Sequence, residues 1–338
     1  MTEAGRRSVE HAVDAANTVD PSALEHLRAA AERAAHAYLT TPPPVMLREL
    51  VRLRDTVYDQ LDRTHKPRQQ AELYLLAGQV CGLLSSVSFD LGNPAVAEDQ
   101  ARAAHIYGSL IDHPSLGAWA LTLLSNMHLW SDRPKQTIVL ASQALESAPI
   151  GTARARLYSV RSRALALLGA TAEVLADLSA ASDELDRAGQ DAFMDGIGGE
   201  MGFGRARLAL CAGAAYVALG DGHQAERETL SALRLFATQP PNERWQAGEL
   251  ACRADLAIAH TLRVQVGDAA GAVEPVLELP AAHRTEALVL RLTKLSRLLG
   301  QRRLRHSVEA SRLRESVTEF VNLARPSGQP TPVLPRRS

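Results

Sequence analysis

The sequence is poor in aromatic residues and carries almost no net charge. Phe, Trp and Tyr make up 4% of the 338 residues, although 46% are hydrophobic. The interior must therefore be filled mainly by Ala, Leu and Val, whose modest volumes suit closely packed helices. The formal net charge of −1 gives no overall attraction to nucleic acids or anionic membranes, so any such contact has to be local.

Cysteine is equally scarce, and long apolar runs are missing. Cys81, Cys211 and Cys252 are odd in number and widely spaced, a pattern that predicts neither a disulfide framework nor a zinc site. We expect buried free thiols in a reducing cytoplasm. The charged N-terminus lacks the apolar core of a signal peptide. No apolar run reaches the roughly 18 residues that a membrane span needs, so we expect no membrane association.

Sequence motifs of enzymes are also missing. The chain contains no HExxH, no paired CxxC, no Gly-x-Ser-x-Gly and no P-loop. The glycine cluster at 196–204 has no strand pattern before it, which a dinucleotide-binding loop would require. His105, His128 and His260 occupy single helical positions, where a surface or structural role is more common than metal ligation. We therefore expect no enzyme, no cofactor and no metal.

What the sequence does contain is a recurring helical pattern interrupted by turns. Around Gly220, small residues stand seven before the turn, at Gly213, and five, nine and twelve after it, at Ala225, Thr229 and Ala232. This spacing predicts two helices whose small residues let them pack closely. Similar patterns are anchored at four other positions, Gly92, Asp132, Gly169 and Gly267. A pair of this kind cannot bury its apolar face alone, so successive pairs are expected to stack.

This pattern resembles the tetratricopeptide (TPR) helix-turn-helix, and the best copies are 213–232 and 85–104. The order of features also resembles the C-terminal sensor half of bacterial helix-turn-helix (XRE-type) transcriptional regulators. Those features are an Arg6-Arg7-Ser8-Val9 linker, an Ala-rich helix ending near 40–43, a turn at 91–94 and the block 205–235.

The resemblance implies an all-α fold, a right-handed α-solenoid of TPR-like helix pairs. It also implies a sensor that relays the binding of a peptide or small signal by changing the curvature of the array. Relatives carry an N-terminal DNA-binding domain. The residues before Asp20 are too few for such a domain, so we expect no direct DNA binding by this chain alone.

The resemblance and the positions of Pro and Gly together divide the chain into five parts. A long glycine-rich connector at 188–204 is expected to be irregular, because glycine disfavours helix, and to serve as a closing segment or a simple connector. The predicted parts are a flexible linker at 1–19, a capping helix pair at 20–66, five TPR-like pairs at 67–281, a capping pair at 282–325 and a disordered tail at 326–338.

A concave groove is the predicted binding site. If the TPR resemblance holds, four positions of each first helix point into it; cations, amides and one Trp there would suit an anionic ligand or a short peptide. Solvated arginines and a packing role for Trp119 are the competing interpretation, and Trp130 and Trp245 are assigned to packing between helices. The predicted groove residues are Gln79, Ser86, Trp119, Thr122, Asn126, Arg156, Ser159, Arg163, Arg207, Lys294 and Arg297.

Two functions remain open from the sequence. The first is a non-enzymatic sensor that binds a peptide or small anionic ligand in a transcriptional regulatory system. The second is a scaffold that holds a partner protein in the same groove, and either form could be a homodimer. A basic run at 291–314 could contact phosphates, although it lacks interleaved aromatics and a recognisable reading helix, and a solvated capping helix is the stronger interpretation.

Overall fold

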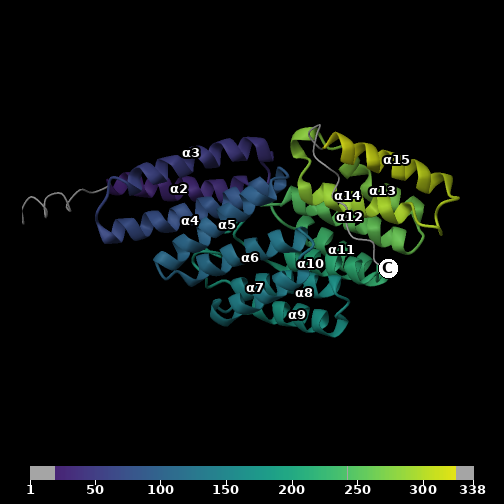
Figure 1. The fold of residues 1–338 in the computed structure, drawn as a ribbon, viewed down its shortest axis with the longest axis horizontal. Coiled ribbons are helices and arrows are strands. Elements are labelled where there is room, and N and C mark those ends of the chain that lie inside the picture. Colours follow the sequence, from purple (N-terminus) through teal and green to yellow (C-terminus); the bar gives the residue numbers. More distant parts are fainter. Residues whose placement is uncertain (1–19, 242, 325–338) are drawn as a thin grey trace, which may run out of the picture.

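The computed structural model describes residues 20–241 and 243–324, and within them the protein is all-helical. These residues form fourteen α-helices and one short 3-10 helix, without a strand (Figure 1). The predicted all-α class is confirmed. The predicted linker at 1–19 and tail at 326–338 lie outside the described residues.

The chain begins with an N-terminal helix pair, α2 (Pro21–Ala37) and α3 (Pro43–Leu61). The helices that follow alternate between two positions: inner helices, which pack on one another, and outer helices, each of which follows an inner helix. The inner helices are α4 (Pro67–Asp90), α6 (Pro114–Trp130), α8 (Thr152–Leu167), α10 (Arg205–Leu219), α12 (Gln246–Leu262) and α14 (Glu286–Leu299). The outer helices are α5 (Pro94–Leu110), α7 (Pro134–Ser147), α9 (Thr171–Leu185), α11 (Gly222–Ala237), α13 (Val266–Leu277) and α15 (Val308–Leu323), with the 3-10 turn η1 (Ala281–His283) before α14.

The helix boundaries follow from proline and from residues with positive φ. Each helix from α2 to α7 has a proline in its first turn, where its missing N–H costs nothing. Gly92, Asp132, Gly169 and Gly220 have φ of 77°, 56°, 76° and 82°, so the predicted turn positions adopt the left-handed conformation that ends a helix. Gly267 does not, because it lies inside α13; Val264 makes this turn instead, at φ 64°.

Each helix from α2 to α12 packs on the next, as α14 does on α15, and each inner helix from α4 to α12 also packs on the next inner helix. In addition α14 contacts α4, so the six inner helices surround a central space. The contact is apolar: Ala287 and Leu290 of α14 pack against the cluster of Phe89 from α4, whose ring stacks on Trp130 of α6 with centroids 5.8 Å apart. The site described below lies inside this ring.

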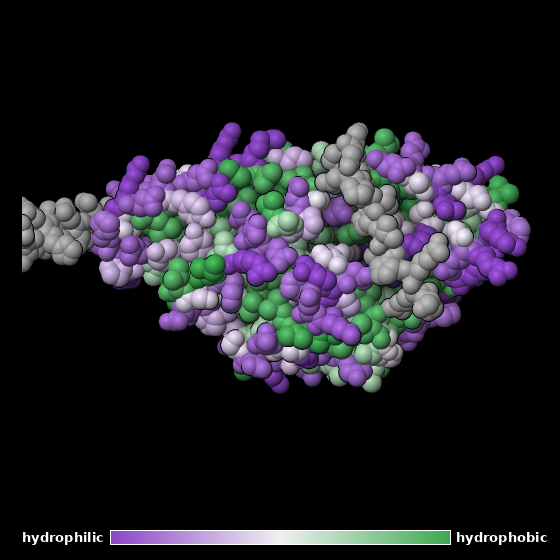
Figure 2. All heavy atoms as spheres, viewed as in Figure 1, coloured by the Kyte–Doolittle hydropathy of each residue, from purple (hydrophilic) through white to green (hydrophobic). Residues whose placement is uncertain are grey.

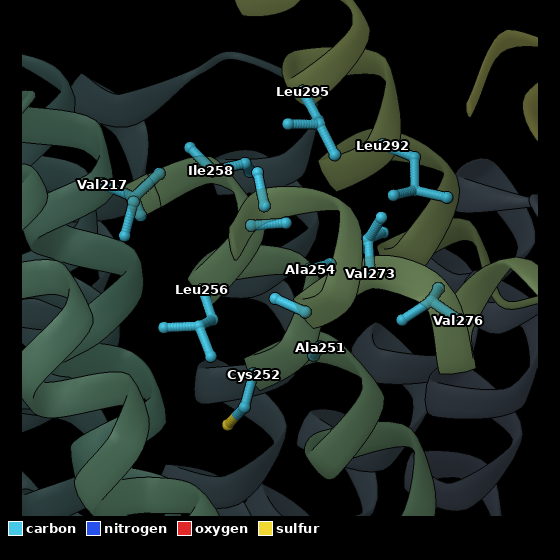
Figure 3. Packing of buried hydrophobic residues seen from close by; sticks show 14 of the residues in the cluster. Val217, Ala251, Cys252, Ala254, Leu256, Ile258, Val273, Val276, Leu292 and Leu295 are labelled. Carbon is cyan, nitrogen blue, oxygen red and sulfur yellow. The ribbon is translucent and has the colours of Figure 1, made fainter. Parts of the chain in front are cut away.

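The core consists of two large clusters, one spanning α2 to α8 and one spanning α10 to α15. In the second cluster the side chains of α12 reach α10 on one side and α13 and α14 on the other (Figure 3). The residues that carry these contacts include Val217, Leu256, Ile258, Val273, Val276, Leu292 and Leu295.

Helix α4 is long and apolar enough to cross a membrane by length and composition alone, which the sequence analysis did not anticipate. However, 83% of its most apolar window is buried inside the protein, against α3, α5 and α6. Its hydrophobicity therefore serves the core of this fold. Figure 2 shows a mixed surface, with hydrophilic residues predominating at both ends of the visible face and apolar residues gathering in the middle.

The glycine-rich segment (residues 188–204) is irregular, as predicted, but it is packed into the protein. Phe193, Met194 and Met201 are buried, and the Phe193 ring meets Trp119 edge-on at 5.9 Å. Asp195 ties the segment to α8, accepting a hydrogen bond of 2.5 Å from the Thr152 hydroxyl.

Two consecutive glycines allow the segment to approach α2. The N–H of Glu200 donates to the carbonyl of Ala35 at 2.9 Å. Gly198 and Gly199 precede it with φ of 70° and 58°, and a Cβ on Gly199 would lie 2.4 Å from the Ala35 carbonyl oxygen. Only glycine satisfies both the left-handed backbone and the close approach.

We expect Gly199→Ala to destabilise the protein by about 2 kcal/mol or more, because a left-handed alanine costs about 1–2 kcal/mol before the clash is added. Urea unfolding would measure the loss. Gly202→Ala is the matched control in the same segment, since its Cβ would meet its nearest neighbour at an ordinary 3.4 Å. Equal stability of the two variants would contradict the assigned role of Gly199.

Candidate functional site

The ring of inner helices encloses a cavity with two compartments. The polar compartment, named for its charged side chains although most of its wall is apolar, lies among α4, α6, α8, α10, α12, α14 and the glycine-rich segment and has a cavity volume of about 160 Å³. The aliphatic compartment lies among α6, α8, α10, α12 and α14 and has a cavity volume of about 150 Å³. Trp130, Arg163, Ala214 and Arg291 line both compartments. A cavity of about this volume can hold a small organic molecule.

Arg163 stands at the junction of the two compartments. Its guanidinium lies 4.8 Å from the centroid of the Trp130 ring, and Arg291 lies 5.1 Å from the same ring. Burial, together with the like charge of Arg291, lowers the pKa of Arg163. The residue stays charged nonetheless, because an arginine does not deprotonate at physiological pH.

The two junction arginines differ in their partners. Arg291 is compensated by Asp255, whose carboxylate is 3.0 Å from its Nε, and it donates to the Ala287 carbonyl. Arg163 has no hydrogen bond or ion pair to any residue that the structure describes. The carboxylate of Asp255 acts favourably on the Arg163 charge from a distance, but it is paired directly with Arg291. A partly buried charge without a paired counter-ion is unfavourable, so Arg163 is the arginine of the cavity that we expect an anion to stabilise most.

Arg156 and Arg207 also face the polar compartment, but they hold the glycine-rich segment. Arg156 Nη2 donates to the carbonyls of Glu200, Met201 and Gly202 at 2.8, 3.1 and 2.9 Å, and burial lowers its pKa to about 10. Arg207 forms an ion pair of 3.2 Å with the Glu200 carboxylate. The chain itself therefore engages both cations, Arg207 through an ion pair and Arg156 through carbonyls, although Arg156 Nε has no partner among the described residues.

Asn126 and Trp245 line the polar compartment. Asn126 Oδ1 and Trp245 Nε1 are buried, and neither has a hydrogen-bond partner among the described residues. A buried acceptor and a buried donor without partners are costly, and a side-chain rotation that turned either toward the compartment would let a polar ligand satisfy it. Arg207 covers the Trp245 ring at 4.5 Å, so this indole is a wall of the site rather than a packing residue alone.

Tyr38, Asp90 and Glu200 form an acidic corner of the polar compartment. The Tyr38 hydroxyl donates to Asp90 Oδ2 at 2.5 Å. Burial raises the pKa of the Asp90 carboxyl to about 7; the Tyr38 hydrogen bond opposes this rise and the negative charge of Glu200 adds to it. The corner joins three separate parts of the chain: the end of α2, the end of α4 and the glycine-rich segment.

The predicted groove residues fall into three groups in the structure. Ser86, Asn126, Arg156, Arg163 and Arg207 line the polar compartment, and Lys294 lines the aliphatic one with Arg163. Gln79, Trp119, Thr122 and Ser159 are buried between helices and line neither compartment. Arg297 is exposed to solvent outside both.

The buried group has a clear cause. Trp119 has no exposed surface because Phe193 of the glycine-rich segment covers it. The Ser159 and Thr122 hydroxyls bond carbonyls of their own helices, Ala155 and Ala118. The groove positions were predicted from the spacing of TPR helices that line an open groove. In this protein the glycine-rich segment folds into that groove and covers some of these positions.

Sequence reasoning missed Tyr38, Asp90 and Glu200, and it assigned Trp130 and Trp245 to packing although both line the cavity. Asp90 is the last residue of a long apolar helix. A carboxylate at the end of such a helix is unusual, and this could have marked it as a candidate site residue. Glu200 follows two glycines in an irregular segment, where no periodicity indicates which way a side chain points.

Metal-ligating side chains do not gather in the described part of the chain: no group of three His, Cys, Asp or Glu residues there could hold an ion. The three cysteines are free. Cys211 lines the polar compartment, and burial raises the pKa of its thiol, which keeps it protonated and a weak nucleophile.

Comparisons with known proteins add no relative: no protein-family model and no curated protein matches the chain.

Asp90 should make stability pH-dependent. Its pKa of about 7 in the folded protein, against an ordinary 3.8, means that between about pH 4 and pH 7 the unfolded chain releases a proton that the folded protein keeps. Stability from this group therefore falls as pH rises through that window.

We expect Asp90→Asn to remove this penalty. The stability of the variant relative to the wild type should rise between pH 5 and pH 8, by at most about 2.7 kcal/mol. Urea unfolding at both pH values measures the difference, with the exposed Asp59→Asn as the control. A difference that is the same at both pH values would contradict an elevated pKa.

Proposed function

We propose that this protein is a non-enzymatic binding module whose helix pairs form a right-handed TPR-like solenoid, closed into a ring around a small anionic ligand. Support for the solenoid comes from the alternation of inner and outer helices and from their sequential contacts. The left-handed turns at the repeat positions Gly92, Asp132, Gly169 and Gly220 add to it.

The observation that carries the ligand proposal is the cation of Arg163. It lies inside a cavity, against an aromatic ring, without a counter-ion among the described residues. Arginine binds carboxylate and phosphate through a planar fork of donors. Asn126, whose amide oxygen has no partner among the described residues, lines the same compartment and is a further polar group that a ligand could engage.

A small ligand is favoured over a partner protein, which is the alternative use of the same groove. The glycine-rich segment already covers Trp119 and engages Arg156 and Arg207. A protein helix or a long peptide would have to displace it. The space that remains, about 160 Å³ in the polar compartment and about 150 Å³ in the aliphatic one, suits a small molecule.

The regulatory role in this proposal rests on the resemblance to the sensor half of XRE-type regulators. A ligand at Arg163 would contact α6, α8 and α14 together, through Trp130, Arg163 and Arg291. Such a ligand stabilises the ring in which these helices are close, and so shifts the population toward that conformation. We place the protein in the cytoplasm, where its free thiols stay reduced.

Arg163→Ala tests the proposal. Thermal unfolding is followed with succinate, benzoate, octanoate and inorganic phosphate as probes, at low and moderate salt. At about 100 times its Kd a bound anion adds about 2.7 kcal/mol of stability. Loss of a charged contact worth about 1.5–3 kcal/mol should weaken binding roughly 10- to 100-fold and reduce its salt dependence.

Arg297→Ala is the matched control, because it removes the same charge outside the cavity and should leave binding unchanged. The proposal is wrong if none of the four anions stabilises the wild type, or if Arg163→Ala responds as the wild type does.

A further inference from the structure

Resting on the proposed anion site at Arg163, we infer that the ligand is an aliphatic carboxylate: one carboxylate head bound at Arg163 and an unbranched hydrocarbon chain in the aliphatic compartment. The inference comes from the walls of that compartment and from the state of its polar groups.

The walls of the aliphatic compartment are hydrocarbon contributed by five inner helices. Apart from the junction, the lining is dominated by aliphatic side chains that no aromatic ring interrupts. They are Leu129, Leu167, Val217, Ala218, Ile258 and Leu290. A surface of this kind gains free energy from each methylene group that it removes from water.

The polar groups of the compartment already have partners. Asp255 is bound by Arg291 at 3.0 Å, and the Lys294 ammonium donates to the Val217 carbonyl at 3.1 Å. Asp132 is exposed to solvent at the rim. Beyond Trp130 and Arg163 at the junction, a chain lying in this compartment meets no side chain that still needs a hydrogen bond.

This arrangement selects against two other kinds of anion. An extended peptide carries an N–H and a C=O at every residue, and each would lose its water without gaining a partner. A polyphosphate needs several cations, whereas the other arginines of the cavity are engaged: Arg156 and Arg207 by the glycine-rich segment and Arg291 by Asp255. A monoanion with an apolar chain satisfies the site with one charged contact.

The orientation follows from the polar groups of the two compartments, since both have largely apolar walls. The polar compartment also contains Asp90, Glu200 and Asn126, whose amide oxygen has no partner among the described residues. The buried carboxylate of the aliphatic compartment, Asp255, is already paired with Arg291. The hydrocarbon chain therefore enters the aliphatic compartment, and the carboxylate lies at the junction beside Arg163.

The test uses straight-chain carboxylates from acetate to decanoate, titrated into the full-length protein by calorimetry below their aggregation concentrations. We expect affinity to rise about three- to fourfold with each added methylene until the compartment is full. Primary alcohols of equal length should bind at least about tenfold more weakly, because they lack the charge for Arg163.

Two variants distinguish the contribution of the ligand's hydrocarbon chain from that of its carboxylate. Ala218→Phe fills the aliphatic compartment and should abolish the gain with chain length while acetate and butanoate still bind. Leu290→Gln, a smaller change on the wall, should reduce the gain per methylene in the same way. The exposed Ala172→Phe is the control for an added aromatic ring and should bind the series as the wild type does.

The outcomes distinguish this inference from the function on which it rests. Binding that requires Arg163 but does not strengthen with chain length would overturn the inference and leave the anion site standing. A gain with chain length that persists in Arg163→Ala and is matched by the alcohols would also overturn it. If no carboxylate binds at all, both the anion site and the inference are wrong.

Discussion

The contact between Arg156 and three successive carbonyls of the glycine-rich segment holds this structure together around its cavity. The carbonyls of Glu200, Met201 and Gly202 turn toward the interior, where unpaired acceptors would be costly. The Arg156 guanidinium donates hydrogen bonds to all three carbonyls. Its Nη2 donors are therefore used within the chain and are not available to a ligand. The segment thus becomes a fixed wall of the polar compartment, and Glu200 is set beside Asp90 and Arg207.

The contact between α14 and α4 has a different effect: it limits the access of water to Arg163. An open groove would expose Arg163 to water, and an exposed arginine needs no counter-ion. With Phe89, Trp130 and Leu290 packed across the closure, the same side chain loses part of its hydration. Arg163 therefore favours a bound anion mainly because the apolar contact between α14 and α4 keeps water away from it. An arginine at an exposed position would have no such preference.

Much of the fold could be predicted from local sequence patterns, because they depend on neighbouring residues. Proline at helix starts and glycine at the turns after α4, α8 and α10 fix those boundaries, and the turn at Asp132 followed from the same spacing. The pattern failed at Gly267, where Val264 adopts the left-handed turn instead. Of the site, Arg163 and Asn126 were identified by their register on inner helices. The burial of Trp119 and the positions of Tyr38 and Glu200 depend on how an irregular segment folds back, and no periodicity encodes that.

A chain of hairpins joined only to their neighbours is mechanically free at its two extremities. The contact of α14 with α4 removes that freedom. A tilt at any one joint must then be shared among the remaining joints, or the Phe89 cluster must separate. Separation of α14 from α4 would bring the apolar side chains of that cluster into water, so the hydrophobic effect favours the form in which the two ends of the series of inner helices meet.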